Sequence, residues 1–244
     1  MIALDADYLI FQLTEGKAQT NSAFPDADGM EVEEYKKPLK PYKKALKKAI
    51  KDVEQEVAAN LPGEVKGIKP FFSDPTGNFR YDIFPDYKKN RKGSERSELF
   101  YRLGRWAFKK YGFVPNTEAD DVVAYHVRKG WIGASFDKDL LKGVAGTWFD
   151  VYHSRRYIVW TTEEDAKHFT LLQTLAGDST DGIIGIPRVG MKTAEKLLIA
   201  NGDNWEGVVK SYENAGLTEE DAILNRRLIG MDQYDGKRVK MFLS

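Results

Sequence analysis

Short apolar runs recur along the chain and predict buried β-strands. They cover residues 1–4, 65–72 and 131–135, and a further strand is expected within 151–160. The first three runs are each followed at once by acidic residues, which would place carboxylates at the carboxyl ends of the strands. In parallel α/β sheets, sites lie at this edge.

Between these runs, apolar residues recur at helical spacing. The residues Leu46, Ile50, Val53 and Val57 predict an amphipathic helix that starts near Pro41 and carries lysines on its outer face. Capping patterns mark further helix starts at Ser94, Thr117 and Thr162. The expected helices are 94–111, a helix from residue 118, 162–175, 191–200 and 218–230.

This alternation of strands and helices predicts an α/β fold with a mainly parallel central sheet flanked by helices, followed by a mostly helical C-terminal part. We expect a first domain over residues 1–161 and a C-terminal part over 162–244, packed as one unit. Within the segment 163–200, a glycine-punctuated turn leads from the helix 162–175 to the helix 191–200.

Composition narrows the classes of function. The 244 residues include no cysteine and only three histidines, so neither a disulfide framework nor a thiolate metal site is possible. No apolar run approaches the roughly 18–20 residues that cross a bilayer, and the first residues lack a secretory pattern. We expect a cytoplasmic protein with no membrane partner.

The net charge is zero, but the charges are segregated along the chain. Lysines crowd residues 35–51, and basic residues also dominate 88–110. Acids gather instead around Glu118, Asp137 and Asp178. Separate basic and acidic zones suit an enzyme that holds phosphates with one and metal ions with the other. A solvated helix face remains the alternative for each basic run, the lysines of 36–51 included.

Acids from several distant segments follow a strand or open a helix. Crowded carboxylates repel one another unless cations lie between them. An all-oxygen ligand set selects a hard ion, so we expect Mg²⁺ or Mn²⁺, and two such ions suit phosphodiester hydrolysis. Taken singly, each acid could also be a helix cap or a solubilising charge. Asp7 either supports a ligand or is solvated.

Several motifs occur together in one order along the chain. They are Leu4-Asp5-Ala6-Asp7, Ser73-Asp74, Asp86-Tyr87-Lys88-Lys89-Asn90-Arg91, Glu118-Ala119-Asp120-Asp121, Asp137-Lys138-Asp139, Gly177-Asp178-Ser179-Thr180-Asp181-Gly182 and Ile186-Pro187-Arg188-Val189-Gly190-Met191-Lys192-Thr193-Ala194. This combination resembles the flap endonuclease superfamily over residues 1–200, and it is most similar to the small 5′→3′ exonucleases of short-tailed phages. Ala6 departs from the commoner glycine, and the segment between Arg91 and Glu118 is shorter than in relatives with a long threading arch.

The resemblance implies a PIN-like nuclease domain, a helix–three-turn–helix hairpin, and a set of metal ligands. On matching positions these ligands are Asp5, Asp74, Glu118, Asp120, Asp121, Asp137, Asp139, Asp178 and Asp181. The implied catalytic residues are Lys88 and Arg91, which would contact the scissile phosphate, together with Asp74, Asp120 and Asp139. The resemblance also implies K⁺ at the hairpin.

Predicted DNA contacts extend from the basic segment to the hairpin. They are Tyr87, Lys88, Arg91, Lys92, Gly185, Arg188, Gly190, Lys192 and Thr193. Lys88 and Arg91, at i and i+3, would present two cations on one side of a helical turn. Tyr87 could stack on an unpaired base or pack in the core. Glycines of the hairpin would let backbone N–H groups approach phosphates.

The sequence therefore predicts a metal-dependent 5′→3′ exonuclease or flap endonuclease that acts in phage DNA replication or primer removal. Its expected partners are duplex DNA with 5′ ends or flaps, an RNA–DNA hybrid and replication proteins, and a monomer is expected. Two other functions are open: a PIN-type ribonuclease and a non-catalytic module that binds DNA ends.

Overall fold

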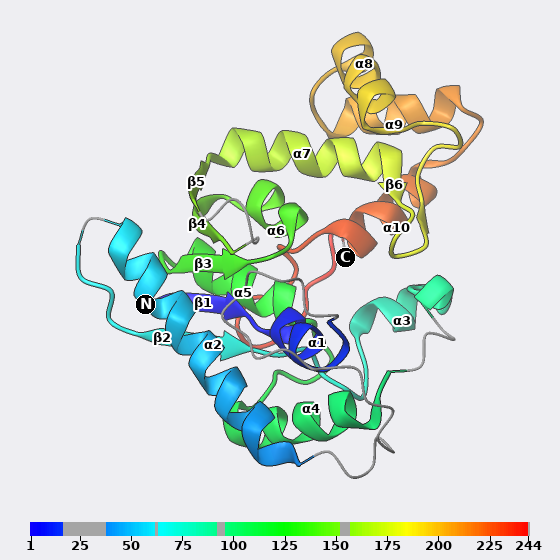
Figure 1. Cartoon of the computed structure of the whole chain (residues 1–244). Coiled ribbons are helices and arrows are strands. Elements are labelled where there is room, and N and C mark those ends of the chain that lie inside the picture. Colours follow the sequence, from blue (N-terminus) through cyan, green and yellow to red (C-terminus); the bar gives the residue numbers. More distant parts are fainter. Residues whose placement is uncertain (17–37, 62, 92–95, 152–156, 244) are drawn as a thin grey trace.

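The computed structural model describes residues 1–16, 38–61, 63–91, 96–151 and 157–243, with Arg91 described only in its backbone. A five-stranded sheet forms its centre, in the order β2-β1-β3-β4-β5 (Figure 1). The strands are β1 (Ile2–Asp5), β2 (Ile68–Phe71), β3 (Ile132–Ser135), β4 (Gly146–Asp150) and β5 (Tyr157–Thr161). The first four run parallel and only β5 is antiparallel, which confirms a mainly parallel sheet.

Helices cover both faces of this sheet because the apolar residues of β1 point alternately to either side. Ile2 and Leu4 pack with α1 (Asp7–Glu15), α2 (Leu39–Asn60) and α4 (Glu98–Tyr111). Ala3 packs on the opposite face with α5 (Ala119–Arg128) and α6 (Lys138–Gly143). The flanking helices confirm the predicted fold class.

The C-terminal part is helical and has a core of its own. It consists of α7 (Glu163–Ala176), α8 (Met191–Asn201), α9 (Trp205–Asn214) and α10 (Glu219–Ile229), and Leu175, Leu198 and Tyr212 are buried between them. A short ribbon of β6 (Gly177–Asp178) and β7 (Ile183–Ile184) links α7 towards α8. The predicted domain boundary at residues 161 and 162 falls between β5 and α7.

Two connections bring this part to the sheet. The helix α7 packs against α6, and α10 runs back to contact α3 (Phe79–Ile83), next to the 3₁₀ turn η2 (Lys89–Arg91) (Figure 1). Residues far apart in sequence thereby meet at the carboxyl edge of the sheet. In the part of the chain that the structure describes, no helix combines the length and apolar character needed to span a membrane.

Some elements differ from the sequence-based expectations. The helices α1 and α9 and the strand β4 were not predicted. The helix α4 begins at Glu98, where the Ser97 hydroxyl accepts a hydrogen bond from Phe100 N. The predicted cap, Ser94, lies outside the described residues. The strand expected within 151–160 is β5, which starts at Tyr157.

Candidate active site

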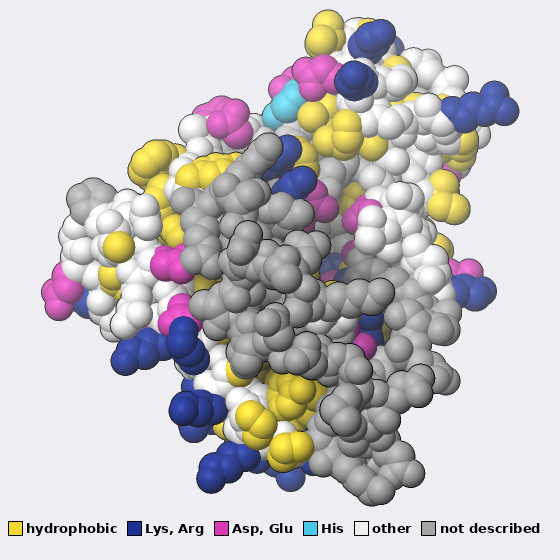
Figure 2. All heavy atoms as spheres, in the orientation of Figure 1, with side chains coloured by type: hydrophobic (Ala, Val, Ile, Leu, Met, Phe, Trp, Pro, Cys, Tyr) yellow, Lys and Arg dark blue, Asp and Glu magenta, His cyan; other side chains and the backbone are white. Residues whose placement is uncertain are grey.

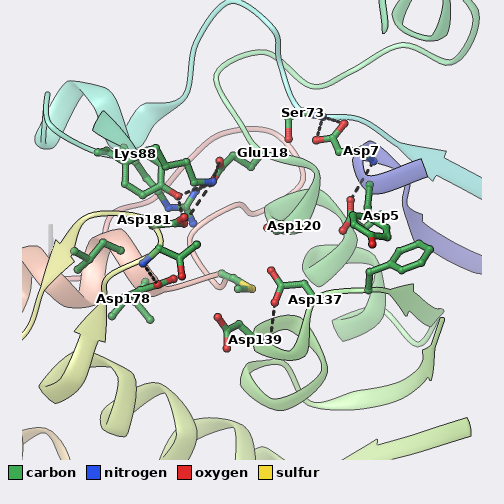
Figure 3. A pocket seen from close by; sticks show the side chains of 18 of the residues that line it. Asp5, Asp7, Ser73, Lys88, Glu118, Asp120, Asp137, Asp139, Asp178 and Asp181 are labelled. Atoms are coloured by element: carbon green, nitrogen blue, oxygen red, sulfur yellow. Dashed lines mark hydrogen bonds and ion pairs between the residues drawn. The ribbon is translucent and has the colours of Figure 1, made fainter. Parts of the chain in front are cut away.

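A cavity of about 780 Å³ opens at the carboxyl edge of the sheet. The ends of β1 and β3, the first turns of α5 and α6, the β6–β7 ribbon and the end of α10 all contribute to its wall (Figure 3). Its acidic lining residues are Asp5, Asp7, Glu118, Asp120, Asp137, Asp139, Asp178 and Asp181. Carboxylates from distant parts of the sequence therefore face one space.

The end of β1 and the start of α1 supply Asp5 and Asp7. The Oδ2 atom of Asp5 lies 3.1 Å from the Ser135 hydroxyl, which also accepts a hydrogen bond from Asp137 N. The Asp7 carboxylate accepts from the backbone N–H of Ser73, with N–O distances of 3.2 and 3.3 Å. Asp7 is thus held in the cavity wall by its hydrogen bonds to Ser73, two residues after β2.

The first turn of α5 presents its acids in two directions. Glu118 is the N-cap, and Asp121 completes a capping box by accepting from Glu118 N. Asp120 faces the cavity, whereas Asp121 is fully buried behind it. There, Asp121 receives two hydrogen bonds of 2.8 Å from the guanidinium of Arg80. A bidentate pair of this kind leaves Asp121 committed to Arg80.

The first turn of α6 repeats this design on the other side of the cavity. Asp137 is the N-cap and accepts from Asp139 N at 2.8 Å. Both carboxylates line the cavity, with Gln173 of α7 beside them. A hydrogen bond from the Gln173 side chain lowers the pKa of Asp139, although burial and the neighbouring carboxylates outweigh it.

Lys88 lies at the opposite end of the cavity from Asp5 (Figure 3). Its Nζ atom is 2.5 Å from Glu118 Oε1 and 3.4 Å from Asp181 Oδ2. The Tyr87 hydroxyl lies 3.0 Å from both Glu118 Oε2 and Asp181 Oδ2. Lys88 has a φ of 54° and its backbone N–H donates to Asp181 O at 2.8 Å. This turn therefore anchors the β6–β7 ribbon to the cavity.

The carboxylates at the two ends have opposite electrostatic surroundings. Burial raises the pKa of Asp5 to about 7, and Asp7 and Asp137 add to that rise. Burial also raises the pKa of Asp139 to about 6, with further repulsion from Asp137 and Asp178, and it raises the pKa of Asp120. Burial opposes ionisation of Glu118 too, but Lys88 and Arg80 hold the pKa of that carboxyl down at about 2.

This contrast shows where the cavity needs positive charge. Arg80 and Lys88 neutralise the end that contains Glu118 and Asp181. Among the described residues, no lysine or arginine forms an ion pair with Asp5, Asp120, Asp137 or Asp139. The carboxylate oxygens of these four residues suit a hard divalent cation, which would relieve the repulsion between the carboxylates. In the described part of the chain, however, no three carboxylates already converge into a closed ligand set.

The structure brings together all but two of the nine predicted metal ligands. Asp121 points away to Arg80. Asp74 lies outside the cavity lining, and its carboxylate accepts from Thr76 N, the Thr76 hydroxyl and Asn116 N at 2.6–2.8 Å. This placement differs from the predicted metal-binding and catalytic role of Asp74. Asp7 lines the cavity, whereas Asp74 does not.

The predicted DNA contacts near the cavity need correction. Tyr87 is only 2% exposed, so it packs in the core and does not offer its ring to a base. Lys88 precedes a 3₁₀ turn in a left-handed conformation, and no α-helical turn places it beside Arg91. The side chain of Arg91 and the whole of Lys92 lie outside the described residues.

The two hairpin glycines lie in different surroundings. Gly190 caps α8 with a φ of −102°, a conformation open to any residue, and a Cβ there would meet nothing within 4 Å. Gly185 is the constrained one, because its Cβ would lie 2.3 Å from Leu175 O. Gly185 therefore permits close packing of β7 against α7. Arg188, Gly190, Lys192 and Thr193 are exposed together at the start of α8.

Sequence reasoning missed Arg80 as a site residue. Its guanidinium donates to Asp121, Glu118, Leu228 O and Gly230 O, and so joins α3, α5 and the end of α10. A lone arginine in the short segment between Asn78 and Ile83 has no periodic signal. Only the proximity of Glu118 and Asp121 in space reveals its role.

Known proteins resemble this chain in sequence and in structure. No family model matches it. A 5′-3′ exonuclease of Buchnera aphidicola (subsp. Acyrthosiphon pisum) is 30% identical over 61% of this chain and 58% of its own length. The exodeoxyribonuclease of Enterobacteria phage T3 is 33% identical over 58% of this chain and 50% of its own length. The chain thus spans little more than half of these curated relatives.

The fold is shared with a 5′ nuclease of bacteriophage T5. A flap endonuclease of that phage, in a pseudo-enzyme-product complex with DNA and metal ions, has a TM-score of 0.69 at 18% identity, covering 96% of this chain and 90% of the other. The T5 5′-exonuclease with bound zinc has a TM-score of 0.68 at 20% identity. The chain is thus similar in sequence to 5′-3′ exonucleases of bacteria and phages, and it shares the fold of the T5 5′ nuclease.

Proposed function

We propose that this protein is a divalent-metal-dependent nuclease that hydrolyses phosphodiester bonds near the 5′ ends of DNA. The observation that carries the proposal is the cavity: carboxylates from β1, α5, α6 and the β6–β7 ribbon face one space, and a lysine lies at its far end. The exonuclease and flap endonuclease relatives support the same activity. A role in phage DNA replication or primer removal is part of this proposal.

The carboxylates without a cationic partner would hold the metal. We assign Asp5, Asp120, Asp137 and Asp139 to this task, with Asp178 and Asp181 closing the other side. Bound Mg²⁺ or Mn²⁺, as a pair of ions, lowers the pKa of water and stabilises the leaving oxygen. The T5 relatives with bound metal ions support divalent metal, whereas K⁺ at the hairpin is supported by the family resemblance alone.

Lys88 would then contact the phosphate at the cleaved bond. In the structure its ammonium group is held by Glu118 and Asp181 and keeps only 19% of its side-chain surface exposed. A cation placed there can stabilise the negative charge that develops on a phosphate in the transition state. Arg80 would position Glu118 for Lys88 without touching the substrate, since it is buried behind both.

The start of α8 is the proposed contact for duplex DNA away from the cut. Gly190 offers no side-chain cap, so the first N–H groups of α8 point outward beside Arg188 and Lys192. A helix N-terminus flanked by cations suits a phosphate group. These contacts carry no base information, so binding through them would be independent of sequence.

The proposal is tested with 5′-labelled duplex, nicked, flap, RNA–DNA and single-stranded RNA substrates in Mg²⁺, with product lengths resolved on a gel. We expect release of short products from the 5′ ends of duplex or flap DNA in Mg²⁺, and no cleavage in EDTA. Cleavage of single-stranded RNA alone would favour a ribonuclease, and binding of DNA without cleavage would favour a non-catalytic end-binding module.

A further inference from the structure

The first half of α2 is rich in lysines, and none of them lines the cavity. Six lysines lie between Leu39 and Lys51 with no acidic residue among them. At 100° per residue, five of them fall within about 100° of arc on one side of the helix. We call this side the lysine face; it consists of Lys40, Lys43, Lys44, Lys47 and Lys51. Figure 2 shows Lys and Arg side chains along the edge where Figure 1 places α2.

An aromatic side chain of another helix lies under this face. The ammonium groups of Lys43 and Lys47 are 5.5 and 5.7 Å from the ring centroid of Trp106, which belongs to α4. Each contact is a cation–π interaction, but two like charges drawn to one ring also repel each other. Trp106 therefore fixes a pair of cations in place on the surface.

No acid compensates this pair within the described residues. Among the described residues, none of the five lysines of this face forms an ion pair, and Lys48, at the margin of the face, pairs with Asp52 at 2.6 Å. The acids Asp52, Glu54 and Glu56 follow only in the second half of the helix. Solvated lysines on an ordinary amphipathic helix are usually interspersed with acids. The uncompensated half is thus a surface complementary to a polyanion.

We propose that the lysine face, with Trp106 beneath it, is a second binding surface for DNA phosphates, outside the cavity. Lys40 and Lys51 are about 16 Å apart along the helix axis, and a DNA strand passes one phosphate per roughly 3.4 Å. Several phosphates of one strand can therefore face the lysines at once. Lysine binds phosphate as a point charge, so this contact is independent of sequence.

The surface is also close to the cavity along α4. Phe100 of α4 lines the cavity, and Trp106 is six residues further, about 9 Å along the same helix. The apolar side of α2 is buried in the core through Leu46, Ile50 and Val53, so the helix cannot turn that side to a lipid bilayer. The inference rests on the proposed nuclease function, because it names a further part of the DNA that the protein holds.

The test compares two double variants that remove the same charge. Lys43→Gln with Lys47→Gln alters the lysine face, and Lys129→Gln with Lys237→Gln alters exposed lysines near Tyr125 of α5, on the other side of the sheet. The affinity of each full-length protein for a 30-base-pair duplex with a 5′ flap is measured by fluorescence anisotropy in Ca²⁺ across a salt series.

We expect the first variant to bind at least about tenfold more weakly at 0.1 M salt, with the log–log salt slope reduced by about two, and the second to bind like wild type. Lys43→Arg with Lys47→Arg should restore binding. Equal effects in both variants, or an unchanged slope in the first, would overturn the proposal. So would a loss of binding to phosphatidylserine vesicles without a loss of DNA binding. Failure of the proposed nuclease function would appear separately, as wild-type protein that binds this DNA but does not cut it in Mg²⁺.

Discussion

The two ends of the cavity are built from the same residue types but differ in how their charge is balanced. Around Glu118, Arg80 and Lys88 supply positive charge, and the pKa of that carboxyl is about 2. Around Asp5 and Asp139 none of the described lysines and arginines forms an ion pair with these carboxylates, and burial raises their pKa values to about 7 and about 6. We call the end around Glu118 the balanced end and the end around Asp5 and Asp139 the unbalanced end, which the proposed divalent cation would complete.

This difference distinguishes residues that hold the structure in place from residues that would take part in the reaction. Buried, paired charges fix the geometry of α3, α5 and the end of α10, and losing one partner leaves an uncompensated charge. Unpaired carboxylates cost stability in the absence of metal, which is a common feature of functional sites. The same acidic residue type therefore has opposite roles at two places in one cavity.

The largest expected effect comes from removing a carboxylate that is proposed to hold the metal. Asp139→Asn and Asp178→Asn should each slow single-turnover cleavage by at least about 10²-fold, because a lost ligand displaces the metal that the reaction needs. DNA affinity should stay near that of wild type, since the basic surfaces are untouched. Cleavage rates within about threefold of wild type for both variants would mean that these acids do not hold the metal.

Lys88→Ala tests the cation at the balanced end. We expect a rate loss of about 10²–10³ on saturating DNA with a smaller change in the dissociation constant, because the ammonium group acts on developing charge. Lys89→Ala is the matched control, since the Lys89 side chain is 65% exposed and pairs with Asp86 at the surface. A Lys88 variant that binds poorly but cleaves normally would assign this lysine to binding alone.

Arg80→Met should destabilise the fold more than any of the other substitutions. Removing the guanidinium leaves Asp121 buried and unpaired, which costs about 3–5 kcal/mol in the free energy of unfolding. Arg105→Ala breaks an exposed pair with Glu98 and should cost less than about 1 kcal/mol. Urea unfolding of both variants measures the difference. Equal losses in the free energy of unfolding would show that the ion pair of Arg80 with Asp121 does not stabilise the fold.

The pH dependence of stability distinguishes the two ends of the cavity without any measurement of activity. A carboxyl whose pKa is raised by folding stabilises the protein while it is protonated, so its contribution is present below about pH 4 and is lost as the pH rises through its folded pKa. In EDTA, wild-type protein should therefore lose stability between about pH 4 and 7, through Asp139 and Asp5.

Asp139→Asn should lose less stability over this range, by on the order of 1–3 kcal/mol, because an amide does not ionise. Glu118 behaves oppositely, since its pKa is lowered by folding: its contribution is present above about pH 4 and is lost only as the pH falls towards about 2. Thermal unfolding across pH measures both trends. Parallel curves for wild type and Asp139→Asn would show that this carboxyl is not destabilised by its surroundings.

The smallest effect concerns the two hairpin glycines. Gly190→Ala should change the free energy of unfolding by less than about 1 kcal/mol, because its φ is −102° and its surroundings are open. Gly185→Ala should cost several times more, since its Cβ would overlap Leu175 O. Chemical denaturation of the pair checks this, and a larger loss for Gly190→Ala would mean that the start of α8 is built differently.

The sequence predicted those parts of the fold and site that have a local signal. Strands followed by acids indicated the mainly parallel sheet, and the resemblance indicated most of the cavity carboxylates. The short strand β4 lacks a detectable period, and Gly133 on β3 leaves room for its Trp148 ring in a way that only the folded sheet reveals. The resemblance also implied Asp121 as a ligand, and no local signal reveals its pairing with Arg80, which lies 41 positions away in the sequence.

The end of the cavity around Asp5, Asp120, Asp137 and Asp139 is, in this view, completed by divalent metal. The most direct measurement is a titration of the full-length protein with Mn²⁺, followed by electron paramagnetic resonance of the free ion, for wild type and for Asp137→Asn. We predict saturable binding of about two ions by wild type and the loss of at least one in the variant. Identical binding curves, or no saturable binding by wild type, would contradict a metal site at this end of the cavity.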